Sequence, residues 1–106
     1  MQFHNYIQNH YNVRSEQIHI IGRSIGTGPA SFLASQVKCS KLVLISPFDS
    51  IRKVSMGLVG CIGFMVKNHF SNEDSILTHN GDLLVIHGMI DEVINCNHGR
   101  ALVTVY

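Results

Sequence analysis

The amino-acid sequence predicts an α/β domain built on a parallel sheet with crossover helices. Three apolar runs carry this prediction: 18–21 (IHII), 42–45 (LVLI) and 83–86 (LLVI). Continuous runs rich in Val, Ile and Leu are typical of parallel strands that helices cover on both faces. Residues 24–37, between the first two runs, place apolar side chains at helical spacing. Residues 18–45 are therefore predicted to form a strand, a helix and a second strand, with a right-handed crossover.

Spacing and turn residues predict the other elements. Residues 3–11 carry apolar and aromatic side chains three and four positions apart, which predicts an opening helix. Pro47 ends the second strand, and Asp49 or Ser50 is placed to cap a following helix. The stretch 51–80 is too long for a plain connection, so it is expected to contain helices, the last of them short and ending at Leu77. A final helix is expected to begin at His98.

The segment 56–66 (MGLVGCIGFMV) is the longest uncharged stretch considered. A helix that spans a bilayer needs about 20 apolar residues, so this segment is too short to span one. A buried or lid-forming helix is the first interpretation. A surface that touches a membrane or contacts an acyl chain is the alternative.

Composition bounds the class of protein. A chain of 106 residues with 45% hydrophobic content is expected to form one globular domain or part of one. The net charge of +1, with scattered basic residues, excludes nucleic acid as an expected partner. The three cysteines form no C-x-x-C pair and the N-terminus shows no secretory signal, so a reducing, cytoplasmic location is expected. The histidines lack metal-ligand spacing, and no cofactor is expected.

The pentapeptide GRSIG at 22–26 directly follows the first predicted strand and opens a helix. This strand, turn and helix context is what a nucleophile elbow requires, so Ser24 is the candidate nucleophile and the backbone N–H of Ile25 a candidate oxyanion donor. A serine that only caps the helix is the alternative. Phosphate-binding loops are disfavoured, since Pro29 and Ala30 stand where a P-loop needs Lys and then Ser or Thr, and no third glycine completes a dinucleotide fingerprint.

A serine nucleophile needs a histidine base and a carboxylate that orients it. Asp91 comes just after the third predicted strand, at the same sheet edge as Ser24, and is the candidate acid. Glu92 is expected to be a solvated loop residue. His98 lies too near Asp91 to be delivered by a further strand, and His87 is expected to be packed or hydrogen-bonded at the strand end. No convincing base lies within the chain.

Three segments resemble the alpha/beta hydrolase domain-containing proteins, nearest the type 17 depalmitoylases and their type 12 and 13 relatives. They are IIGRSIGTGPASFLAS, LVLISPFDSIRKVS and LLVIHGMIDEVINCNHGRAL. The resemblance implies a partial α/β-hydrolase domain over 1–106, with Ser24 as nucleophile and Asp91 as acid. It also implies that the early strands, the H-G-N loop with the second oxyanion donor, and a later G-x-x-H segment with the base are expected outside these residues.

The leading functional hypothesis is a serine hydrolase of esters or thioesters, with lipidated protein as the substrate class and contact with a membrane surface. The isolated chain is expected to show little or no turnover. The alternative is a non-catalytic pseudoenzyme or interaction fragment of the same fold, which would self-associate through unpaired strand edges. A nucleotide-binding α/β protein ranks last.

Overall fold

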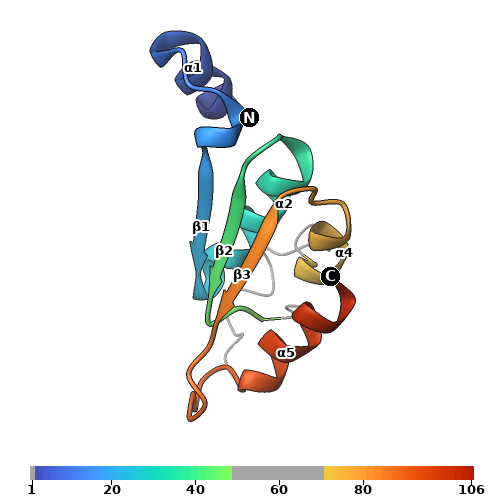
Figure 1. The fold of residues 1–106 in the computed structure, drawn as a ribbon. Helices are drawn as coiled ribbons and strands as arrows, with labels where there is room; N and C mark the ends of the chain where they lie inside the picture. Colours follow the sequence, from blue (N-terminus) through green and yellow to red (C-terminus); the bar gives the residue numbers. More distant parts are fainter. Residues whose placement is uncertain (1, 49–70) are drawn as a thin grey trace.

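The computed structural model describes residues 2–48 and 71–106, and it contains the three predicted strands. β1 (His19–Arg23), β2 (Lys41–Ile45) and β3 (Asp82–Ile86) form one parallel sheet in the order β1-β2-β3. Arg23 pairs with Ile45, which pairs with Ile86, so the three strands end at the same level (Figure 1). The loops that leave their carboxyl ends therefore start side by side.

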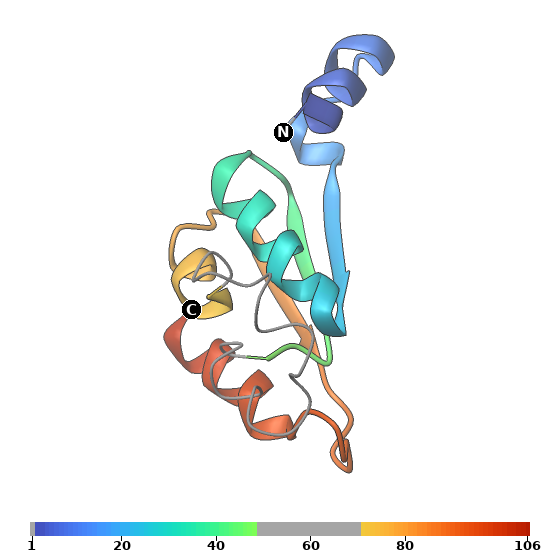
Figure 2. The ribbon, with the colours of Figure 1, turned by 180° about the vertical axis from the view of Figure 1, so that it is seen from behind.

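Helices and 3-10 turns account for most of the described residues outside the strands. They are α1 (Gln2–Tyr11), α2 (Thr27–Gln36), α4 (Asn72–Leu77) and α5 (Cys96–Val105), with 3-10 turns η1 (Ser15–Gln17) and η2 (Ser24–Gly26). Figures 1 and 2 show α2, α4 and α5 on one face of the sheet, while α1 extends beyond the end at which β1 begins. The α/β class predicted from the sequence is confirmed.

Local caps explain where the two later helices begin. The Ser71 side chain accepts a hydrogen bond from the N–H of Asp74 at 3.2 Å, as expected for a short helix with acidic residues in its first turn. Asn95 caps α5 in the same way, so this helix begins two residues before the predicted start at His98. The predicted cap at Asp49 or Ser50 and the segment 56–66 lie outside the described residues.

The core lies in the single layer between the sheet and its helices. Leu42 and Leu44 of β2, Ile76 of α4 and Leu102 of α5 have no exposed surface. The small residues of α2 that face the sheet let this helix lie close to β1. The three strands and the helices α2, α4 and α5 thus contribute apolar side chains to a common core, whereas α1 does not.

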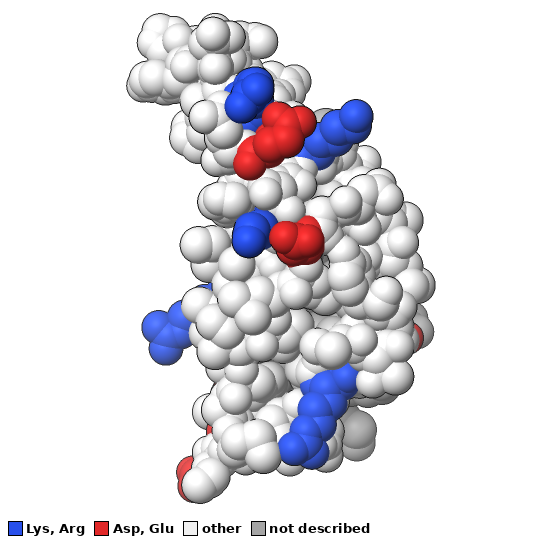
Figure 3. Space-filling view, viewed as in Figure 1, with Lys and Arg blue, Asp and Glu red and all other residues white. Residues whose placement is uncertain are grey.

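The opposite face of the sheet is bare in the described part of the chain. Ile21, Leu84 and Ile86 are 66%, 52% and 48% exposed, and no described helix covers them (Figure 1). The expectation that helices cover both faces is therefore wrong for the described elements, because the described connections all place their helices on the same side. Figure 3 shows scattered charges on this side and much uncharged surface between them.

Candidate active site

Ser24 is the first residue of η2 and directly follows β1. It is exposed and has a φ of 49°, in the left-handed region that non-glycine residues rarely adopt. The Thr27 hydroxyl donates a hydrogen bond of 2.7 Å to the carbonyl oxygen of Ser24, which fixes this turn to the start of α2. The N-cap positions of η2 and α2 are Arg23 and Gly26, so Ser24 is not a helix-capping serine.

Gly22 lets the strand and the helix approach each other at this turn. A Cβ atom at Gly22 would lie 2.6 Å from the Cβ of Ala30, 2.7 Å from the carbonyl oxygen of Gly26 and 2.8 Å from the Cα of Thr27. A Cβ atom at Gly26 would meet nothing within 4 Å. The motif's two glycines are therefore not equivalent: the close approach requires Gly22, whereas Gly26 has room for a side chain.

Ile25 is the middle residue of η2, directly after Ser24. Its side chain is 57% exposed, so it is not held in the core. No side-chain hydrogen bond caps the start of η2 or of α2, whose N-cap residues are Arg23 and Gly26. The backbone of Ile25 thus belongs to the first turn that follows the serine, the position from which an oxyanion donor would act.

Asp91 lies in the loop that follows β3. One carboxylate oxygen, Oδ1, accepts hydrogen bonds from the backbone N–H groups of Ile94 at 2.9 Å and Val93 at 3.0 Å. These two bonds lower the pKa of the Asp91 carboxyl below its ordinary value, and the Ser46 hydroxyl and nearby His87 act in the same direction. The loop thus holds Asp91 as a carboxylate, the form in which a triad acid acts.

The lowered pKa predicts how this loop responds to acid. A carboxyl whose pKa is lower in the folded state contributes stability above its unfolded pKa of about 3.9, and that contribution is lost as the pH falls through the folded pKa. We expect the amide resonances of Val93 and Ile94 to shift with a midpoint below about 3.9 in an NMR titration. Asp91→Asn should abolish the transition, and the control Asp82→Asn should leave it. A midpoint above the ordinary carboxyl range would contradict the arrangement.

Ser46 also lies at this edge of the sheet, and the sequence analysis did not single it out. It follows β2 as Ser24 follows β1, has a φ of 47°, and donates its backbone N–H to the carbonyl oxygen of Ile86 at 2.8 Å. Its side chain hydrogen-bonds to Asp91. The S-P-F segment directly after the second apolar run was the sequence feature that could have indicated this residue.

Two histidines flank the loop of Asp91. His87 Nε2 lies 2.7 Å from the carbonyl oxygen of Ile94 and 3.7 Å from Asp91 Oδ2, and its side chain is 7% exposed. Its Nδ1 is buried, so neither ring nitrogen is presented to a serine hydroxyl. His98 lies in the first turn of α5. His87 is thus packed and hydrogen-bonded at the strand end, as expected from the sequence.

Known proteins resemble this chain over most of its length. It is 34% identical over 99 residues to human alpha/beta hydrolase domain-containing protein 17B, a match that covers 91% of the chain and 33% of that relative. The chain is thus similar to proteins named as alpha/beta hydrolases. Protein 17C of the mouse is 35% identical over 99 residues, which are 29% of its length, so this chain spans about a third of these curated relatives. No protein-family model and no solved structure matches it.

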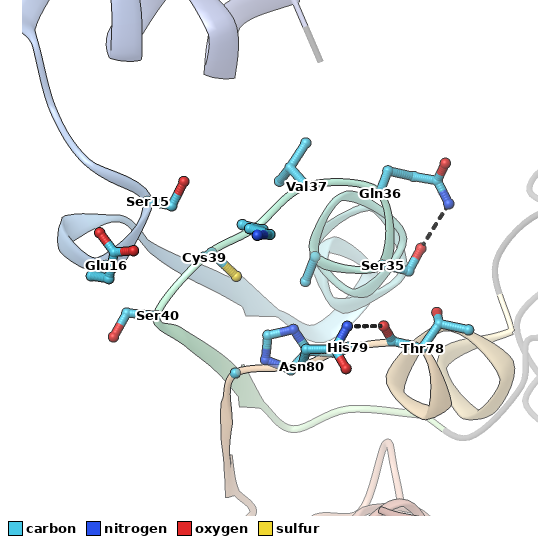
Figure 4. Close-up of a pocket in the computed structure, with 13 residues that line it drawn as sticks. Ser15, Glu16, Ser35, Gln36, Val37, Cys39, Ser40, Thr78, His79 and Asn80 are labelled. Atoms are coloured by element: carbon cyan, nitrogen blue, oxygen red, sulfur yellow. Dashed lines mark hydrogen bonds between the residues drawn. The ribbon is translucent and has the colours of Figure 1, made fainter.

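A cavity of about 430 Å³ lies at the other end of the sheet, where the strands begin (Figure 4). Cys39 and His79 are among its lining residues. Burial raises the pKa of the Cys39 thiol, which disfavours the reactive thiolate. Among residues 2–48 and 71–106 there is no cluster of side chains suited to a metal ion and no helix with the length and apolar character needed to cross a bilayer.

Proposed function

We propose that this chain carries the nucleophile and the acid of a serine hydrolase that cleaves ester or thioester bonds. The observation that supports this most strongly is the exposed Ser24, which has a φ of 49° directly after β1. A left-handed serine costs free energy that the surrounding structure must supply, and such strain concentrates at functional sites. Similarity to alpha/beta hydrolase domain-containing proteins 17B and 17C supports the same reaction class.

The proposed reaction proceeds through an acyl-enzyme. Ser24 Oγ attacks the carbonyl carbon while a histidine accepts its proton, and the thiol or alcohol leaves with that proton. The N–H of Ile25 stabilises the oxyanion, and Asp91 orients the histidine. Water then releases the acyl group. We place the histidine and a second oxyanion donor outside these 106 residues, because His87 is already hydrogen-bonded within its loop.

The proposed substrate is an acylated protein, with depalmitoylation as the reaction. This finer assignment rests on the resemblance of the three sequence segments to the type 17 hydrolases. A lipid-modified substrate would bring the protein to the cytoplasmic surface of a membrane, where the acyl chain leaves the bilayer before cleavage. No cofactor takes part in this reaction.

Fluorophosphonate labelling tests the role of Ser24. We expect the isolated chain to label very slowly, since we assign no base for Ser24 among its described residues, and added imidazole to increase labelling at Ser24. Ser24→Ala should abolish the increase, whereas Ser35→Ala, at the opposite end of α2, should not change it. Labelling that persists in Ser24→Ala would contradict the assignment of Ser24 as the nucleophile. Rapid labelling without imidazole would contradict the proposal that the base lies outside this chain.

A non-catalytic interaction fragment is the second candidate. The exposed apolar residues of the uncovered sheet face, Ile21, Leu84 and Ile86, favour it, because such patches on soluble proteins mark contact surfaces. This candidate predicts no imidazole-dependent labelling at Ser24 under any condition. The labelling experiment therefore separates the two functions.

A further inference from the structure

We propose that His87 is the positioning residue for Asp91: its ring ties the end of β3 to the far side of the loop that carries the acid. We call residues 87–95 the acid loop. This proposal rests on the proposed function, since it takes Asp91 to be the triad acid. His87 does not touch substrate in this assignment, and it acts through the carboxylate.

The hydrogen bonds within the acid loop form a connected set. His87 Nε2 donates to the carbonyl oxygen of Ile94 at 2.7 Å, because a carbonyl can only accept. The N–H of the same Ile94 donates to Asp91 Oδ1 at 2.9 Å. Ile94 is therefore held from both sides, and the ring of His87 fixes the residue whose amide orients the carboxylate.

Burial of these residues raises the free-energy cost of breaking either hydrogen bond. The His87 side chain is 7% exposed and Ile94 is 6% exposed. A buried carbonyl that loses its donor is left unsatisfied, which is costly, so the loop strongly favours the arrangement in which His87 donates. Asp91 Oδ2 lies 3.7 Å from the same Nε2, which places the second carboxylate oxygen beside the ring.

Gly99 in α5 provides the space that the ring occupies. A Cβ atom at Gly99 would lie 2.8 Å from His87 Nδ1, 3.4 Å from its Cγ and 3.2 Å from Val85 Cγ1. The ring is thus confined between the acid loop and the first turns of α5. Alanine favours a helix over glycine, so a loss caused by Gly99→Ala would come from displacement of the His87 ring, the nearest group, and of Val85.

Amide hydrogen exchange on the full 106-residue chain tests the proposal. His87→Phe keeps the approximate volume and removes the donor, and we expect the Val93 and Ile94 amides to exchange at least tenfold faster while those of Leu42 and Leu44 keep their rates. His87→Gln, which restores an N–H near the position of Nε2, should recover most of the protection. The matched control is His79→Phe, another buried histidine at the opposite end of the sheet, which should leave the acid loop unchanged.

A second variant covers the case in which His87→Phe does not fold. Gly99→Ala should displace the ring and accelerate the same two amides, Val93 and Ile94. The proposal would be overturned if a folded variant showed unchanged amide exchange in the acid loop. It would also be overturned if the amide of Leu42 and those of the loop exchanged faster by the same factor. The exchange rates do not depend on reaction at Ser24, so failure of the labelling experiment with intact exchange effects would refute the hydrolase function and leave the positioning contacts established.

Discussion

Gly22→Ala is expected to destabilise the chain by at least about 3 kcal/mol, near the upper end of the usual range for overpacking. The added methyl group would lie under 3.0 Å from Ala30, Gly26 and Thr27, and two of the three contacts are with backbone atoms that cannot rotate away. Relief requires α2 to move off β1. Because small domains are stable by only about 5–15 kcal/mol, this loss is a large share of the total. The shift of the urea unfolding midpoint measures it.

Gly26→Ala is the matched control for this substitution. Gly26 has a helical backbone, with φ −68° and ψ −11°, and open space at its Cβ position. We expect its unfolding free energy to stay the same or to rise by about 0.4–1 kcal/mol, because alanine has fewer unfolded conformations. Equal losses for the two variants would show that strand and helix are not in close contact at Gly22.

The second large effect is expected in the association state. The uncovered sheet face exposes Ile21 and Leu84, and the outer edges of β1 and β3 have no described strand beside them. Exposed apolar surface and free strand edges both favour contacts between copies. We expect the wild-type chain at micromolar concentration to sediment as dimers and larger species.

Lysine substitutions on this face test the cause of the association. Ile21→Lys combined with Leu84→Lys should shift the sedimentation distribution strongly towards monomer. Leu77→Lys is the control, since Leu77 is 60% exposed but lies on α4 instead of the sheet. A compact monomer of wild-type chain, or an equal effect of the control, would contradict the role of this face.

The sequence predicted the strands closely because their apolar runs are continuous. The run at 83–86 became β3 (Asp82–Ile86), and the run at 42–45 became β2 (Lys41–Ile45). Because the apolar runs are continuous, they do not indicate which face of the sheet the helices cover. A strand that is apolar on both sides carries no information about the side on which its helices pack, so the bare face with Ile21 could only be seen in the structure.

The candidate site was predictable where it follows from topology. Ser24 and Asp91 come after parallel strands of one sheet, so their placement at a common edge needs only the order of the elements. The contributions of Ser46 and His87 could not be predicted in the same way. Their contacts with Asp91 and Ile94 depend on the shape of a loop and on strand register, which local sequence spacing does not determine.

The aligned ends of the three strands set a length scale for the site. β2 lies between β1 and β3, and neighbouring strands are about 4.8 Å apart, so the backbones that carry Ser24 and the acid loop leave the sheet about 10 Å from each other. Backbone hydrogen bonds fix this separation whatever side chains β2 carries. Substitutions among the side chains of β2 should therefore leave the distance between the two loops unchanged.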